Sequence, residues 1–252
     1  MSISSTKTFF IYSAVTISLF IGSIMTSTVS ALETATTATD TNAVQTIVAE
    51  TASSAGTTAA PSPNMLSALV EDKHYITKFP NSNRAKKPQV IEFFSYMCPH
   101  CYRMEGTVNR WKKQKPEGVE FVKIPVAFQG NALYMIAARA HYIAEELGVL
   151  EAFGPAMFSR IHVDRRPPRN DRDLAKLFAE LGVSDADFKK ASVNNFNVES
   201  KLRRSTFLMN QYQVNGVPYF LINYKYEMGP EANKSQEELF KVWNNLPFKD
   251  FQ

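Results

Sequence analysis

Cysteine is almost absent from this sequence. The 252 residues contain two cysteines, Cys98 and Cys101, which excludes a scaffold held together by several disulfides. Histidine is also rare, and His74, His141 and His162 are scattered along the chain without a second ligand pair nearby. Because a tetrahedral zinc site needs four ligands at recognisable spacings, the sequence argues against a metal site.

The sequence also lacks a basic cluster. Its formal net charge is +4; leaving out Lys7 gives +3, and leaving out the acidic residues at 33, 40 and 50 as well gives +6 for residues 64–252. This excess is spread along the chain and is not interleaved with aromatic residues in a stripe. We therefore expect no nucleic-acid partner.

A long apolar run occurs only near the N-terminus. Residues 9–25 carry no charge, follow Lys7 and lead into small residues at 29–31. This layout predicts a signal peptide over residues 1–31, cleaved after export. A retained membrane anchor is the alternative, because a run of about 17 residues is at the lower limit for spanning a bilayer. Residues 32–64 are rich in Thr, Ala and Ser and predict a disordered spacer.

The rest of the chain alternates between strand and helix patterns. We expect strands at 75–79, 90–94, 119–126, 219–222 and 225–228, and helices at 98–113, 133–147, 149–161, 170–181, from 184, 198–212 and 235–245. The helix at 149–161 contains Gly154-Pro155, so it could be either continuous or broken at that dipeptide. The order predicts an α/β fold whose sheet is interrupted by a block of helices.

The two cysteines form the motif Cys98-Pro99-His100-Cys101 at the start of the helix predicted at 98–113. A disulfide between residues three apart closes too short a loop to stabilise the fold much, so reactivity explains the pair better. The helix N-terminus favours the thiolate of Cys98, while Pro99 is tolerated at the first helical position and His100 can add a donor or a positive charge. A stabilised thiolate predicts a disulfide that oxidises other thiols, with Cys101 as the buried resolving thiol.

Charged residues stand in apolar surroundings close to this motif. Glu92 lies inside one predicted strand and Lys123 inside the next, while Glu105 follows Cys101 by four residues and shares its helix face. Two interpretations stay open. The three residues form a structural ion-pair network, or they store the proton that Cys101 needs as the disulfide opens and closes.

The dipeptide Val217-Pro218 precedes another apolar strand. A cis peptide bond here would turn the backbone and leave a strand edge beside Cys98, which could bind a substrate peptide through backbone hydrogen bonds. A trans bond is the commoner state for any single proline.

Together these motifs resemble the DsbA family of bacterial periplasmic thiol:disulfide oxidases. The resemblance covers most of residues 66–246 and rests on Phe93-Phe94-Ser95 before Cys98-Pro99-His100-Cys101-Tyr102, on Pro116-Glu117-Gly118-Val119 and on Gly216-Val217-Pro218. It implies an α/β thioredoxin fold with an inserted helical domain. Residues 65–130 and 213–252 would form the thioredoxin-like domain, and residues 131–212 would form the insertion.

The resemblance also implies roles for individual residues. Cys98 would be the nucleophile and Cys101 its partner, Val217-Pro218 the cis-proline loop, and Glu92, Glu105 and Lys123 the buried charged network. No cofactor is expected beyond the redox-active disulfide. The expected partners are reduced exported proteins as substrates and a quinone-linked membrane oxidase of the DsbB type, which would reoxidise a monomeric protein in the periplasm.

Two other functions fit part of the pattern. One is a disulfide isomerase or reductase on the same fold, although residues 32–64 are a poor candidate for the folded dimerisation domain of a dimeric isomerase. The other is a peptide-binding holdase whose disulfide is vestigial.

Overall fold

The computed structural model describes residues 68–128, 130–193 and 195–251, so the predicted signal peptide and spacer lie outside the described residues. Within these ranges, five strands form one mixed sheet in the order β1-β5-β4-β2-β3. The strands are β1 Tyr75–Thr77, β2 Gln89–Phe94, β3 Glu120–Pro125, β4 Tyr219–Ile222 and β5 Tyr226–Met228.

Strand β2 lies inside the sheet and leads to the cysteines. It pairs in parallel with β3, which places Glu92 beside Lys123, and antiparallel with β4, which places Glu92 beside Phe220. All six residues of β2 are buried. The apolar run therefore forms the buried strand that its pattern predicts, and a charged residue is buried with it.

Helices occupy most of the remaining described chain. They are α2 Pro99–Lys112, α3 Ala132–Glu146, α4 Leu150–His162, α5 Asp171–Glu180, α6 Asp185–Ser192, α7 Phe196–Gln211 and α8 Gln236–Asn245, with 3₁₀ turns η1 Glu231–Asn233 and η2 Leu246–Asp250. Asn170, Ser184 and Ser235 cap α5, α6 and α8 as their sequence patterns predict. Helices α3 to α7 all lie between β3 and β4 in the chain, which confirms an α/β fold with a helical insertion.

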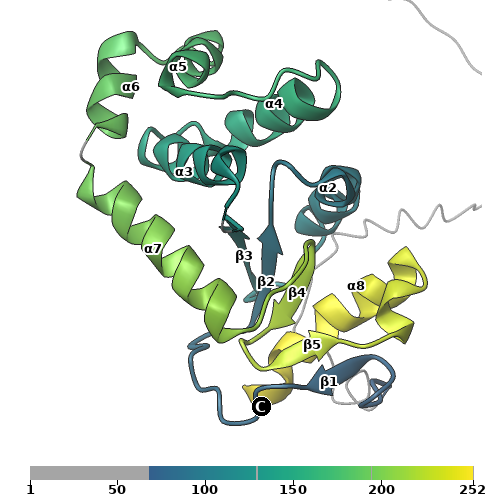
Figure 1. The fold of residues 1–252 in the computed structure, drawn as a ribbon. Coiled ribbons are helices and arrows are strands. Elements are labelled where there is room, and N and C mark those ends of the chain that lie inside the picture. Colours follow the sequence, from purple (N-terminus) through teal and green to yellow (C-terminus); the bar gives the residue numbers. More distant parts are fainter. Residues whose placement is uncertain (1–67, 129, 194, 252) are drawn as a thin grey trace, which may run out of the picture. The chain divides into compact units, whose positions relative to one another are not determined.

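The sheet is covered on both faces. Helices α2 and α8 pack on one face around Trp111 and Trp243, and α7 packs on the other through Leu208 and Tyr212. Figure 1 shows α3 to α6 grouped beyond the ends of β2 and β3, while α7 runs back along the sheet. Both cysteines belong to the apolar cluster that the insertion forms with the end of β2. The motif from Cys98 to Cys101 therefore lies where the sheet meets the insertion.

Helix α4 decides between the two alternatives that the sequence left open. It is continuous through Gly154 and Pro155. Proline removes one backbone hydrogen bond, but Phe153 and Met157 on either side are buried and hold both halves of the helix against the core. Separately, no helix in the described part of the chain has the length and apolar character needed to cross a membrane.

Candidate active site

Cys98 caps the N-terminus of α2. Its backbone is extended, Pro99 occupies the first turn of the helix, and the Cys98 Sγ accepts a hydrogen bond from the Cys101 backbone N–H at 3.5 Å. Both cysteines are free thiols, with exposed fractions of 8% for Cys98 and 0% for Cys101. Pro99 and His100 are exposed between them. Cys98 is thus the more accessible sulfur and the one nearest the free N–H groups of the helix.

The loop before β4 lies against the Cys98 sulfur. The Cys98 thiol donates to the backbone carbonyl of Val217 at 3.2 Å, and the Val217-Pro218 peptide bond is cis. Val217 and Pro218 are both partly exposed. The cysteine motif and the Val217-Pro218 loop, which are 116 residues apart from Cys101 to Val217, therefore meet at the Cys98 sulfur.

The three charged residues also come together. The Lys123 Nζ lies 3.5 Å from the Glu92 Oε2 and forms a hydrogen-bonded ion pair with Glu105. It also lies 4.3 Å from the centroid of the Phe94 ring, within cation–π distance. The Glu92 carboxylate is fully buried and has no hydrogen-bond donor among the described residues. Among the described residues, the negative charge of Glu92 is thus compensated by the Lys123 ammonium and by no hydrogen bond.

Burial sets the protonation of this cluster. It raises the pKa of Glu92 to about 7, with nearby Lys123 opposing part of that rise. Burial also raises the pKa of the Cys101 thiol far above its usual range, and the negative charges of Cys98 and Glu92 add to the effect. For Lys123, burial lowers the pKa, but Glu92 and Glu105 outweigh it and the net direction is upward. At neutral pH, Lys123 is charged while Glu92 can both take up and release a proton.

A groove of about 870 Å³ opens beside this cluster, lined in part by Tyr96, Glu105, Lys123 and His141. The side chains of Lys123 and Glu105 are each 20% exposed, whereas that of Glu92 is 0% exposed. The ion pair therefore lies between solvent in the groove and the buried carboxylate.

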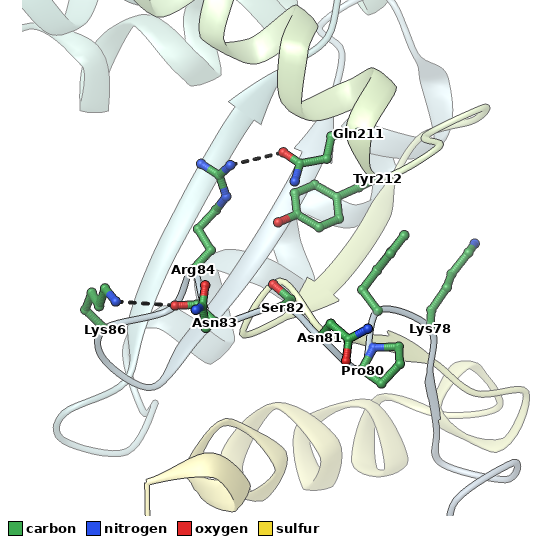
Figure 2. A pocket seen from close by; sticks show the side chains of 10 residues that line it. Lys78, Pro80, Asn81, Ser82, Asn83, Arg84, Lys86, Gln211 and Tyr212 are labelled. Carbon is green, nitrogen blue, oxygen red and sulfur yellow. Dashed lines mark hydrogen bonds between the residues drawn. The ribbon is translucent and has the colours of Figure 1, made fainter.

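A second hollow lies away from the cysteines. Figure 2 shows it between the loop from Lys78 to Lys86 and the end of α7, where Arg84 donates to the Gln211 side chain at 3.1 Å. Its volume is about 690 Å³, and neither cysteine lines it. Because neither cysteine lines this hollow, we do not include it in the candidate site.

Three residues at the site were missed by sequence reasoning. The Tyr96 hydroxyl lies 2.9 Å from the His141 Nδ1, and the Tyr96 carbonyl lies 2.8 Å from the His162 Nε2. In the sequence, both histidines stood out only as possible metal ligands. The position of His141 beside Ala137, Ala140 and Ala144 on an apolar helix face was the available signal that it is buried.

Comparisons show that this chain is similar to known thiol:disulfide interchange proteins. The family model described as a DSBA-like thioredoxin domain matches residues 89–240. The thiol:disulfide interchange protein DsbA of Burkholderia cepacia is 34% identical over 156 residues, which are 62% of this chain and 72% of that protein. The crystal structure of Pseudomonas aeruginosa DsbA has a TM-score of 0.63 at 27% identity and covers 73% of this chain and 96% of that one. A Proteus mirabilis DsbA variant with a non-covalently bound peptide has a TM-score of 0.63 at 31% identity, with 72% and 99% covered.

Proposed function

The chain belongs to the family of DSBA-like thioredoxin domains, and from that premise we propose that it donates its Cys98–Cys101 disulfide to cysteines of newly exported proteins. Family membership makes it a disulfide oxidoreductase, since its relatives are thiol:disulfide interchange proteins. The proposal adds the direction of transfer, which is oxidation of the substrate, and the route, which is a mixed disulfide at Cys98.

The position of the Cys98 sulfur carries the proposal. It lies at the start of α2, where the Cys101 N–H donates to it and the positive end of the helix stabilises negative charge on an atom in that position. A stabilised thiolate makes the reduced pair favourable, and a pair that is stable when reduced is a strong oxidant when it is a disulfide.

The transfer takes place in two exchanges. A substrate thiolate attacks the Cys98 Sγ, the Cys98–Cys101 bond breaks, and Cys101 leaves with the electron pair while a mixed disulfide forms at Cys98. A second substrate thiolate then attacks the substrate sulfur of the mixed disulfide and releases the Cys98 thiolate. The substrate loses two electrons and gains a disulfide, and the enzyme gains two electrons and becomes a dithiol.

Glu92 has the protonation behaviour that this exchange needs. The pKa of the Cys101 thiol is raised by burial, so the departing sulfur takes up a proton at neutral pH. We propose that Glu92, whose pKa is about 7, supplies that proton and recovers it through the Lys123–Glu105 pair at the groove. This interpretation favours the proton-store hypothesis over a purely structural network.

Substrate binding is assigned to the loop at Val217 and Pro218. The Val217 carbonyl already contacts the Cys98 sulfur, so backbone groups of the loop are within reach of a peptide attached there. The peptide bound to the Proteus mirabilis relative supports peptides as ligands of this family.

We propose the bacterial periplasm as the compartment, because disulfides persist in oxidising environments and a signal peptide at 1–31 would export the chain. A quinone-linked membrane oxidase of the DsbB type would remove the two electrons and regenerate the disulfide. No bound cofactor takes part in either half of this proposed cycle.

Refolding of a reduced substrate with several cysteines tests the proposal. The oxidised wild type should restore substrate disulfides stoichiometrically, and Cys98→Ser should restore none. Cys101→Ser, first loaded with glutathione as a mixed disulfide at Cys98, should release glutathione to an attacking substrate thiolate and accumulate a mixed disulfide between Cys98 and the substrate. If Cys98→Ser suppresses aggregation of the substrate as well as wild type does, and neither protein transfers a disulfide, thiol chemistry is excluded and a holdase remains. Rapid reduction of insulin without oxidation of the substrate would favour a reductase.

A further inference from the structure

His162 contacts the chain on both sides of the reactive motif. It is the last residue of α4, in the insertion, and its Nε2 lies 2.8 Å from the backbone carbonyl oxygen of Tyr96. A carbonyl oxygen only accepts, so the Nε2 carries the hydrogen and donates it. Tyr96 precedes Cys98 by two residues.

The ring of His162 makes the second contact. It stacks on the ring of Tyr102, with centroids 5.0 Å apart and planes 11° apart. Tyr102 directly follows Cys101 in α2. One imidazole from the insertion therefore touches residues before and after the Cys98–Cys101 turn.

The hydrogen bond to Tyr96 is an external anchor of that turn. The turn satisfies other backbone groups locally, because the N–H groups of Met97 and Cys98 donate to the side chain and the carbonyl of Ser95. The Tyr96 carbonyl instead points across to the insertion, which fixes the plane of the peptide that joins Tyr96 to Met97. Rotation of that peptide would move the backbone that leads into Cys98.

We propose that His162 is a positioning residue for the disulfide exchange: its Nε2–H holds the Tyr96 carbonyl so that the Cys98 sulfur stays between the Cys101 N–H and the Val217 carbonyl. The inference rests on the proposed function only in taking Cys98 and Cys101 as the redox pair. Without the anchor, the sulfur aligns less well with the Cys101 N–H. The thiolate then loses part of its stabilisation, and the pair becomes a weaker oxidant.

Two substitutions separate the hydrogen bond from the stacking. His162→Phe keeps a ring that can stack on Tyr102 but has no donor, and His162→Gln replaces the ring with an amide that can donate to the Tyr96 carbonyl. We expect His162→Phe to shift the equilibrium between the pair and glutathione towards oxidised enzyme by about two- to tenfold, the range of one hydrogen bond. His162→Gln should recover most of that shift.

Arg160→Gln is the matched control. Arg160 lies in the same last turn of α4 and pairs with Glu180 and Asp164, away from the reactive turn. This variant should lower Tm through lost ion pairs and leave the glutathione equilibrium at the wild-type value. The control shows what destabilising this end of α4 does by itself.

The outcomes are distinguishable from failure of the proposed function. A wild-type protein that oxidises no substrate contradicts the proposed function. A wild type that does oxidise, with His162→Phe at the same glutathione equilibrium or with no recovery in His162→Gln, overturns only the role of His162. If His162→Phe does not fold, nitrogen NMR of the reduced wild type decides: an Nε2–H tautomer at His162 supports the anchor, and an Nδ1–H tautomer excludes it.

Discussion

The sheet and the insertion each bury an ionisable side chain close to Tyr96 and the cysteines, but the two side chains differ in their polar partners. In β2, Glu92 is fully buried and finds only Lys123 at 3.5 Å. In α3, His141 is 4% exposed and its Nδ1 lies 2.9 Å from the Tyr96 hydroxyl. Burial favours the neutral form of both, since it raises the pKa of Glu92 to about 7 and lowers that of His141 to about 3.

The difference separates a side chain that changes its charge near neutral pH from one that stays neutral there. Because the Tyr96 phenol is neutral, its pKa being raised by burial, its hydroxyl can donate to the His141 Nδ1. His141 is then neutral and satisfied throughout the physiological pH range. Glu92 changes its charge within that range and has no comparable partner among the described residues. A buried acid in this state is unfavourable for stability when ionised, which supports its proposed part in proton transfer.

The largest expected effect comes from removing the buried histidine together with its partner. The pKa of His141 is about 3 in the folded protein and about 6.5 in the unfolded chain, so between these pH values only the unfolded chain takes up a proton at His141. The free energy of unfolding is therefore highest above pH 6.5 and decreases as the pH falls towards 3. We expect the double variant Tyr96→Phe/His141→Phe to unfold with nearly wild-type free energy at pH 7. Its advantage over wild type should grow to about 5 kcal/mol near pH 3.

Urea unfolding at a series of pH values measures this effect. The single variant His141→Phe is the control, because it leaves the Tyr96 hydroxyl buried without its partner and should lose about 1–3 kcal/mol at pH 7. If the free energy of unfolding depends on pH in the same way for the double variant and wild type, burial does not lower the pKa of His141. The rate of thiol exchange between pH 5 and 8 should keep its wild-type shape in the double variant.

The next largest effect concerns Glu92. Its folded pKa is above its unfolded value, so the folded protein holds an extra proton between about pH 4.5 and 7 and loses stability as the pH rises through that window. Relative to wild type, Glu92→Gln should be near neutral below pH 4.5 and more stable by about 3 kcal/mol above pH 7. Thiol exchange should be slower and should lose its inflection near pH 7.

The Glu92 measurement needs two controls. For the stability curves, the Cys98→Ser background leaves out any contribution of that thiol. For both stability and exchange, the exposed Glu117→Gln should leave the pH dependence unchanged. A large change in stability with unaltered exchange kinetics would return the network to a structural role.

The smallest expected effect comes from the cation. Lys123 is the main influence that lowers the pKa of Glu92, so Lys123→Met should move the Glu92-linked inflection of the exchange rate upward, by about one pH unit or more. Lys112→Met is the matched control, because Lys112 acts on Glu92 more weakly and pairs with Glu151. An inflection that stays near pH 7 in Lys123→Met would mean that the pair does not set the protonation of Glu92.

Much of this site could be predicted from local patterns. The strand before Cys98, the helix that starts at Pro99 and the capped helices at Asn170, Ser184 and Ser235 follow from signals a few residues long. The pairing of Glu92 with Lys123 was also predictable, because a strand-helix-strand unit makes neighbouring parallel strands. Contacts between the sheet and the insertion could not be predicted in this way. His141 and His162 follow Tyr96 by 45 and 66 residues, and no local pattern around Tyr96 indicates that they lie within hydrogen-bond distance of it. The continuity of α4 also depends on contacts distant in sequence, because the packing of Phe153 and Met157 against the core outweighs the local effect of Pro155.

The equilibrium between the Cys98–Cys101 pair and glutathione tests the central claim most directly. Because the Cys98 sulfur lies at the start of α2 beside the Cys101 N–H, the reduced pair should be favoured and the disulfide strongly oxidising. We predict a reduction potential more positive than about −180 mV, the value of protein disulfide isomerase. A value near −270 mV, as in thioredoxin, would contradict the account and identify a reductant.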